Sequence, residues 1–187
     1  MPRIQDARIL IMATDGFEQS ELMEPLERLK AKGATVDVAA PKPGEIKGWK
    51  EKNWGDTVRV DVPVSSVQAE SYDALVLPGG QMNPDVLRMD SKALAVIGAF
   101  LAGGKIVAAI CHAPWLLIEA KAVQGRRVTS YRSIRTDVLN AGGNWVDEEV
   151  VVDDGIITSR SPADLPAFIA KIVEEVEEGR HYRREAA

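Results

Sequence analysis

The sequence is poor in residues that form covalent cross-links. Cys111 is the one cysteine among 187 residues, so the chain has no internal disulfide and no zinc site built from paired cysteines. A lone thiol fits a reducing compartment, and the short apolar run after Arg8 does not match the pattern of a secretory signal. We therefore expect a cytoplasmic protein in which one thiol chemistry is available.

Long apolar runs and an excess of basic charge are also missing. Residues 93–118 are the most apolar stretch, but Gly103, Lys105 and Pro114 interrupt it before it reaches the about 20 residues that a membrane span needs. The chain has 23 Lys and Arg against 28 Asp and Glu, and its net charge of −5 has the wrong sign for binding nucleic-acid phosphates. Neither a membrane nor a specific nucleic acid is an expected partner.

Short signatures of nucleotide and zinc sites do not occur. The sequence contains no G-x-x-x-x-G-K-[ST], no G-x-G-x-x-G and no H-E-x-x-H. These motifs supply the phosphate-binding loops and the paired imidazoles that such sites require. We therefore expect a site without metal and without cofactor.

The sequence does contain short apolar runs that alternate with helical stripes. Four of the runs are typical of buried parallel strands: residues 7–13, 35–40, 73–77 and 106–110. Residues 161–176 carry the clearest helical stripe, and we expect Ser161 to cap this helix with Asp164 in a capping box; Ser91 is the expected cap of an earlier helix. The alternation predicts an α/β fold with a mostly parallel sheet covered on both faces.

Composition and connectivity predict one domain. A hydrophobic content of 45% suffices for one sizeable core, and no linker, repeat or low-complexity segment divides the chain. We place the core at about residues 7–176 of a single domain spanning 1–187, followed by a polar tail at 179–187. Residues 57–62 alternate like an edge strand, and residues 149–159 predict a hairpin that turns at Asp154-Gly155.

The segments that follow the buried strands are the candidate site. Open α/β sheets bind ligands at the carboxyl ends of their strands, so these segments should meet at one edge of the sheet. They comprise residues 14–18, 78–81, 111–112 and 131–132.

Cys111 stands where a buried strand must turn at once into a helix. The small residues Ala109 and Ala113 flank it at the spacing of a nucleophile elbow, in which a sharp turn brings those two positions together. A helix N-terminus aimed at the thiol should lower its pKa below the free value of about 8.5. The alternative is a buried cysteine that acts only as a small hydrophobic residue.

Three further residues could act with this thiol. His112 is adjacent, although neighbouring side chains at a strand end tend to point apart, and it could equally be a structural hydrogen-bonding residue. Glu18 and Glu21 follow the first strand, where carboxylates are often merely solvated at a helix start. Only convergence on Cys111 would make either glutamate catalytic.

Backbone groups and aromatic residues complete the candidate site. The Gly79-Gly80 turn exposes N–H groups, and the amides of Gly80 and His112 could form an oxyanion hole. Gly79 and three aromatic residues could line the site or serve only in packing: Tyr131, Trp49 and Trp54.

Four segments, taken in order, resemble the ThiJ/PfpI superfamily, and most closely its PfpI intracellular protease branch. They are FEQSE at 17–21, DALVLPGG at 73–80, AICHAP at 109–114 and RSPADL at 160–165. The resemblance implies a flavodoxin-like three-layer sandwich with a strained cysteine at the elbow. It also implies a relationship to class I glutamine amidotransferases, but their His-x-Glu pair is absent, so we do not expect glutaminase activity.

The resemblance further implies roles for individual residues. Glu18 matches a glutamate that hydrogen-bonds the cysteine, here Cys111, and His112 matches the family histidine. Asp85 matches an acidic residue that reaches across a subunit interface to the histidine of the neighbouring subunit. We therefore expect a homodimer, with a higher homo-oligomer as the alternative.

The resemblance implies a cysteine-dependent enzyme of the stress response. Related proteins are described as intracellular proteases, or as cofactor-free glyoxalases and deglycases that act on methylglyoxal and its adducts. The expected substrate is thus a small carbonyl compound or a peptide. The alternative is a non-catalytic oxidative-stress sensor or chaperone in which Cys111 is oxidised. The sequence does not separate these functions.

Overall fold

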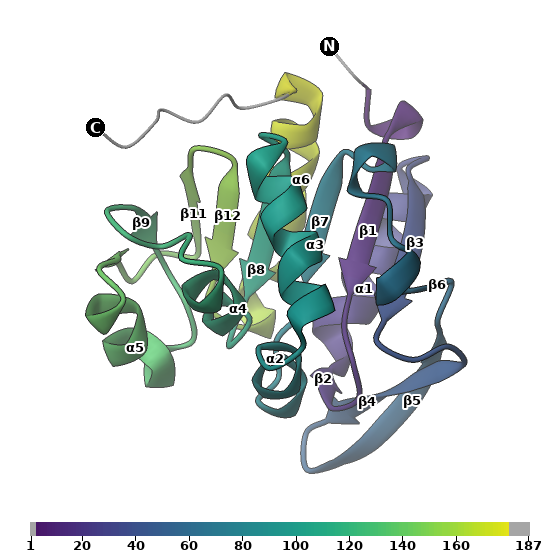
Figure 1. Ribbon diagram of the computed structural model, residues 1–187, viewed down its shortest axis with the longest axis horizontal. Helices are drawn as coiled ribbons and strands as arrows, with labels where there is room; N and C mark the ends of the chain where they lie inside the picture. The colour runs from purple at the N-terminus through teal and green to yellow at the C-terminus, as the bar shows by residue number, and fades with distance from the viewer. Residues whose placement is uncertain (1–2, 180–187) are drawn as a thin grey trace.

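A seven-stranded sheet forms the centre of the computed structural model, which describes residues 3–179 (Figure 1). In spatial order its strands are β11 (Val150–Asp153), β12 (Ile156–Ser159), β8 (Ile106–Ile110), β7 (Ala74–Leu77), β1 (Arg8–Met12), β3 (Thr35–Ala40) and β6 (Val62–Pro63). All neighbours pair in parallel except β11 and β12. The predicted α/β fold with a mostly parallel sheet is confirmed.

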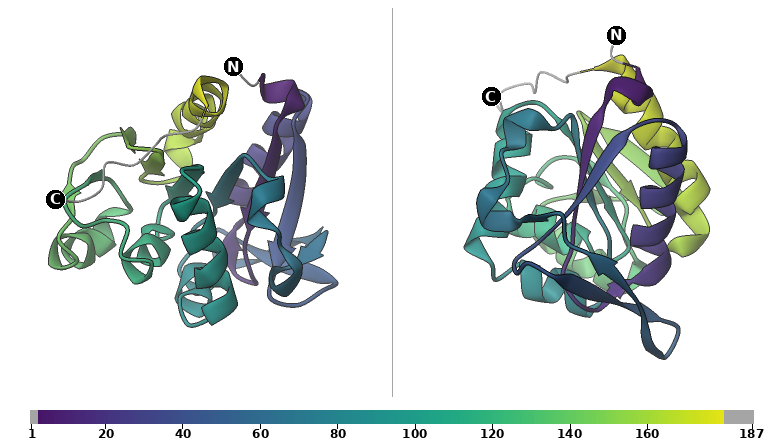
Figure 2. Two further views of the ribbon diagram at one scale, coloured as in Figure 1. Left: turned by 45° about the horizontal axis from the view of Figure 1, so that its top comes forward. Right: turned by 90° about the vertical axis from the view of Figure 1, so that its right-hand side faces the viewer.

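Helices cover both faces of this sheet (Figure 2). The helices α1 (Gln19–Ala31) and α6 (Leu165–Glu178) lie on one face, and α3 (Ser91–Ala102) lies on the other. Strand β1 contributes side chains to the core on both faces of the sheet, because successive side chains point to opposite faces. Ile9 packs in one core cluster with Phe168 of α6, and Leu10 packs in the other with Phe100 of α3. The three-layer sandwich is therefore present.

Shorter elements extend the two ends of the sheet. A second sheet contains β2 (Phe17–Glu18), β4 (Glu45–Lys50) and β5 (Asn53–Arg59), and a third pairs β9 (Arg127–Val128) with β10 (Asn144–Trp145). The remaining helices are α2 (Met82–Leu87), α4 (Pro114–Glu119), α5 (Arg135–Asn140) and the 3₁₀ turns η1 (Ile4–Asp6), η2 (Val64–Ser66), η3 (Ala69–Ser71), η4 (Arg132–Ile134) and η5 (Pro162–Asp164). Figure 1 places α2 and the β4–β5 hairpin beyond the carboxyl end of β1.

Three local predictions can be compared with the structure. The hairpin turn at Asp154-Gly155 is confirmed, since both residues have positive φ, 49° and 79°. The two predicted helix caps are wrong. Asp90 caps α3, because its carboxylate accepts from the N–H of Lys92 and Ala93. Asp164 instead accepts from the backbone N–H and guanidinium of Arg160, so no capping box forms and α6 begins after η5.

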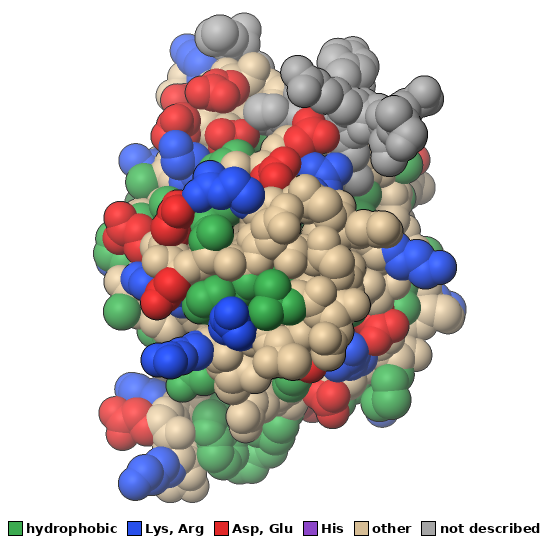
Figure 3. All heavy atoms as spheres, turned by 90° about the vertical axis from the view of Figure 1, so that its left-hand side faces the viewer, with side chains coloured by type: hydrophobic (Ala, Val, Ile, Leu, Met, Phe, Trp, Pro, Cys, Tyr) green, Lys and Arg blue, Asp and Glu red, His purple; other side chains and the backbone are tan. Residues whose placement is uncertain are grey.

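Charged side chains of both signs intermingle on the surface. Figure 3 shows acidic and basic groups beside one another over the face that lies on the left of Figure 1. Ion pairs such as Arg127 with Glu148 and Arg160 with Asp147 connect acidic and basic groups on the surface.

Within residues 3–179, no helix is both long and apolar enough to cross a membrane. The predicted tail lies, apart from Gly179, outside the described residues.

Candidate active site

Cys111 follows the last residue of β8 and has a left-handed backbone, with φ of 65°. This conformation is costly for a residue with a Cβ atom, so the surrounding structure must hold it in place. The N–H of Cys111 donates to the carbonyl of Ser159 at 3.0 Å, and its carbonyl accepts from the N–H of Tyr131 at 2.8 Å. The sharp strand-to-helix turn expected of a nucleophile elbow is thus anchored on both sides.

The left-handed turn brings the neighbouring thiol and imidazole together. The distance from Cys111 Sγ to His112 Nδ1 is 3.1 Å, so the expectation that these side chains point apart is wrong. The alternation of side chains in a strand ends where the backbone leaves the extended region, which happens at Cys111. Both residues are largely enclosed, with 6% and 5% of their surfaces exposed.

The imidazole of His112 contacts three further side chains of its own chain. Its Nε2 lies 3.1 Å from the hydroxyl oxygen of Ser133, and its ring stacks on Tyr131 with centroids 4.8 Å apart. The ring of Trp115 lies 5.3 Å away on a tilted plane, and its indole N–H donates to Asp137 at 2.8 Å. Burial lowers the pKa of His112, which favours a neutral imidazole able to accept a proton.

Glu21, and not Glu18, is the carboxyl group beside the thiol. Glu21 is completely buried, its Oε2 accepts from the N–H of Gly79 at 2.7 Å, and its side chain hydrogen-bonds with Cys111. Glu18 is half-buried and accepts from the hydroxyl of Ser20 at 3.2 Å. The contact that the resemblance assigned to Glu18 is therefore corrected to Glu21.

Helical spacing explains why Glu21, and not the expected Glu18, lies beside Cys111. Glu21 is in α1, where it shares a buried stripe with Pro25 and Leu29 at intervals of one turn. Glu18 belongs to β2, where it pairs with Trp49 of β4. A carboxylate in line with an apolar helical stripe is a signal in the sequence that could have identified Glu21, and the sequence-based prediction did not use it.

The Glu21 carboxyl is protonated in the resting site. Burial, assisted by the nearby charge of Glu18, raises its pKa to about 8, although hydrogen bonds from Gly79 and Cys111 oppose the shift. Its Oε1 is buried and accepts no hydrogen bond from a nitrogen or oxygen within the described part of the chain. A neutral carboxylic acid close to a thiol can donate a proton at neutral pH.

The thiol itself also rests in its neutral form. Burial raises the pKa of Cys111, while the N–H groups of Gly80 and His112 oppose the shift. The predicted lowering of this pKa is therefore wrong, because burial outweighs the amides at the turn. Deprotonation requires an adjacent base, and His112 Nδ1 is in place to serve as one.

The glycine pair allows the three groups to approach one another. A Cβ atom on Gly79 would lie 2.7 Å from Cys111 Cβ and 2.7 Å from Glu21 Oε2. Gly80 has φ of 77°, and a Cβ there would lie 2.6 Å from the carbonyl oxygen of Gly16. The amides of Gly80 and His112 interact with the Cys111 sulfur, and their oxyanion role stays a prediction.

Three other candidates remain predictions. Trp49 and Trp54 pack edge to face in the β4–β5 hairpin with centroids 5.5 Å apart, and Trp54 is half exposed. Asp85 is exposed on α2, and the described structure is that of one chain. No group of three or more His, Cys, Asp or Glu side chains within residues 3–179 is arranged to hold a metal ion.

Comparison with known proteins gives consistent matches. Residues 7–175 match the DJ-1/PfpI family. A deglycase of Thermococcus kodakarensis is 45% identical over 166 residues, which cover 89% of this chain and 97% of the relative. General stress protein 18 of Bacillus subtilis is 44% identical over 163 residues, covering 86% and 92%. The crystal structure of Drosophila melanogaster DJ-1beta superposes with a TM-score of 0.82 at 29% identity, covering 92% and 94%. The chain therefore belongs to the DJ-1/PfpI family, as the resemblance of its four motifs implied.

Proposed function

We propose that the chain is a cysteine-dependent deglycase that removes methylglyoxal adducts from amines and thiols. The observation that carries this proposal is the cluster of Cys111, His112 and Glu21, in which a thiol, a neutral base and a protonated acid meet in a buried space. Relatives named deglycase and general stress protein support it. Both names agree with the sequence-based prediction of a PfpI-type stress enzyme.

The first step uses the thiol and the imidazole. The Cys111 proton passes to His112 Nδ1 as Sγ bonds to the adduct carbon that carries the hydroxyl group. The bond from that carbon to the amine or thiol breaks, and the imidazolium returns the proton to the departing group. A hemithioacetal of Cys111 remains, and no oxidant or reductant is needed.

The second step isomerises this hemithioacetal. His112 removes the hydrogen from the carbon bonded to sulfur and returns it to the neighbouring carbon. The Glu21 carboxylic acid donates to the carbonyl oxygen as electrons move toward it, and its proton is restored as the thioester forms. Water then hydrolyses the lactoyl thioester to lactate and free Cys111.

Enclosure of the site favours a small carbonyl substrate over a polypeptide. Cys111 and His112 are both buried, so a reacting carbon must enter a confined space. A peptide bond would need an open groove that accepts an extended chain. A redox sensor is less well supported, because an oxidisable cysteine is generally an exposed thiolate and burial raises the pKa of this thiol.

Assembly as a homo-oligomer and a cytoplasmic location are part of the same proposal. Three apolar side chains on and just after α2 are exposed: Met82, Val86 and Met89. A second copy of the chain would cover them, and Asp85 lies on the same helix. The reducing environment of the cytoplasm would keep Cys111 in the reactive thiol form.

Replacement of Cys111 tests the proposal. We expect Cys111→Ser to abolish release of N-acetylcysteine and N-acetyllysine from their methylglyoxal adducts, followed by liquid chromatography with lactate as the second product. Thermal unfolding should show that the variant still folds. Adduct turnover by the serine variant at the wild-type rate would disprove the proposal.

A comparison of substrates is the second test of the proposed function. Free methylglyoxal and a fluorescent casein should be assayed beside the adducts at equal enzyme concentration. Faster turnover of the adducts supports a deglycase, whereas cleavage of casein that depends on Cys111 would identify a protease instead.

A further inference from the structure

A buried amide side chain connects the carboxyl ends of two neighbouring strands, β1 and β7. Asn83 of α2 is completely buried, and its Oδ1 accepts from the N–H of Thr14, shortly after β1, at 2.8 Å. Its Nδ2 donates to the carbonyls of Pro78 at 2.8 Å and Gly79 at 3.1 Å, directly after β7. These partners fix the orientation of the amide, because the first is a donor and the other two are acceptors.

The two carbonyls that Asn83 binds belong to successive peptide units. The first unit joins Pro78 to Gly79, and its N–H donates to Glu21 Oε2 at 2.7 Å. The second joins Gly79 to Gly80, and its N–H interacts with the Cys111 sulfur. A peptide unit is planar, so a contact that holds its carbonyl also sets the direction of its N–H.

We propose that Asn83 is a positioning residue that directs the N–H groups of Gly79 and Gly80 into the candidate site. Glycine populates both signs of φ at little cost, so these peptide units would rotate more freely without the amide. A carbonyl that accepts a hydrogen bond also polarises its peptide unit and strengthens the N–H as a donor. The part of Asn83 in turnover rests on the proposed function, whereas its effect on the Glu21 carboxyl does not.

The titration of Glu21 tests the proposal without substrate. Between the pKa values of Glu21 in the unfolded and folded chain, only the unfolded chain ionises, so stability declines until pH reaches the folded value of about 8. The N–H of Gly79 favours the carboxylate, and its loss should therefore raise this pKa. Asn83→Leu keeps the shape of the side chain and removes its three hydrogen bonds; Asn83→Ala replaces it if the leucine variant does not fold.

Urea unfolding at pH 4–10 measures where the decline ends, with Glu21→Gln added to each variant as the baseline. We expect the end point about one pH unit higher in the Asn83 variant, as one hydrogen bond to a charged group predicts. Lys105→Met is the matched control, because Lys105 is also buried and donates to three backbone carbonyls away from the site. It should lower stability and leave the end point at the parent pH. An end point that is unchanged or lower in the Asn83 variant, or equally raised in Lys105→Met, would overturn the proposal.

Kinetics on an adduct substrate are the second readout. Asn83→Leu should lower kcat about tenfold and change KM little, since the reacting groups lose their aligned N–H donors while the substrate contacts stay. Lys105→Met should keep the parent kcat per folded molecule. A parent kcat in an Asn83 variant whose end point has shifted would contradict its part in turnover. If the parent protein turns over no adduct, the proposed function fails, and the titration of Glu21 still decides whether Asn83 positions the turn.

Discussion

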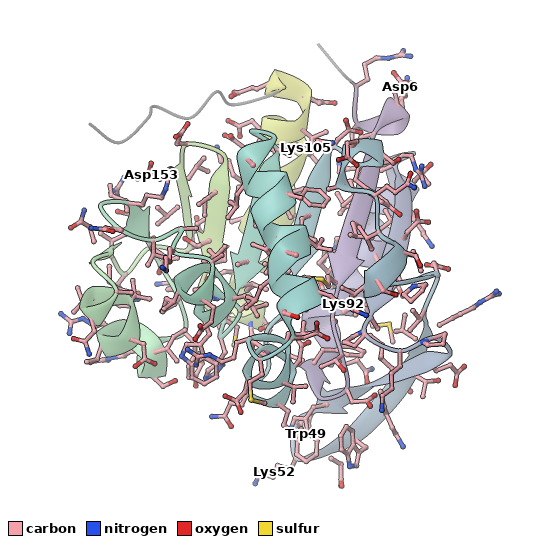
Figure 4. All side chains as sticks on the ribbon, in the orientation of Figure 1. Asp6, Trp49, Lys52, Lys92, Lys105 and Asp153 are labelled. Atoms are coloured by element: carbon pink, nitrogen blue, oxygen red, sulfur yellow. The ribbon has the colours of Figure 1, made fainter. Side chains whose placement is uncertain are left out.

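The two ends of β8 bury polar groups in opposite ways. At the amino end, Lys105 is 8% exposed, and its ammonium donates to the carbonyls of Ala69 at 2.7 Å and Glu70 at 3.0 Å, and also to that of Tyr72. At the carboxyl end, Glu21 is completely buried, and its Oε1 has no hydrogen-bond partner among the described residues. Figure 4 shows Lys105 and Trp49 toward opposite ends of the sheet.

The two ends differ in how far hydrogen bonds replace the hydration that each buried group loses. Around Lys105, backbone carbonyls converge on the buried cation and compensate for its lost hydration. Around Glu21, incomplete compensation keeps the carboxyl neutral to about pH 8, as the proposed role of a proton donor requires. Strand β8 thus connects the buried polar cluster at Lys105 to the candidate site at Cys111.

The largest expected effect is on the pH dependence of stability, through Glu21. Its pKa is about 8 when folded and 4.5 in the reference state, so only the unfolded chain ionises between these values. The contribution of protonated Glu21 to the free energy of unfolding is fully present below pH 4.5. It is lost as pH rises through 8, and the loss amounts to roughly 4–5 kcal/mol. Urea unfolding across pH 4–9 should show this decline, and Glu21→Gln should remove it.

Glu27→Gln on the same helix is the matched control, because Glu27 is exposed. It should leave the decline intact. An equal decline in Glu21→Gln and the parent protein would show that Glu21 is not the group that titrates.

A smaller loss is expected at the opposite end of β8. Lys105→Met should lower the free energy of unfolding by about 3 kcal/mol, because three carbonyls lose their donor. The activity per folded molecule should not change. Lys92→Met, at an exposed position in α3, should have almost no effect on urea unfolding. A loss of activity in Lys105→Met beyond its unfolded fraction would contradict the separation of the two ends.

Gly79→Ala should destabilise the chain by about 2 kcal/mol and reduce adduct turnover at least 100-fold. The new Cβ would lie 2.7 Å from Cys111 Cβ and from the carbonyl oxygen of Ile110, so Cys111 and Glu21 must move apart. Gly98→Ala is the control, because a Cβ there meets no atom within 4 Å and Ala favours the helix. Full activity in Gly79→Ala would show that the close approach is dispensable.

The smallest effect is expected from the cap of α3. Asp90→Ala should lower stability by about 1 kcal/mol, since the N–H groups of Lys92 and Ala93 lose their acceptor. Asp90→Asn should retain most of the cap. Calorimetry measures the change, and adduct turnover should stay at the parent level in both variants. Lower turnover in a folded Asp90→Ala variant would place this cap in the site.

Residue patterns predicted the fold better than they predicted the contacts of the site. The runs at 35–40 and 106–110 coincide with β3 and β8, because fully buried strands need continuous apolar sequence. The elbow at Cys111 followed from its place between small residues. The choice between Glu18 and Glu21 depends on which residue begins α1, and helix starts are weakly encoded. Ser133 gave no signal, since its contact with His112 spans 21 positions of sequence.

The left-handed backbone of Cys111 implies a conflict between folding and chemistry. Glycine would adopt φ of 65° without the penalty of roughly 1 kcal/mol or more that a side chain incurs. A sequence selected only for stability would thus favour glycine at the end of β8. Under the proposed function, the thiol at this position exchanges some folding stability for reactivity.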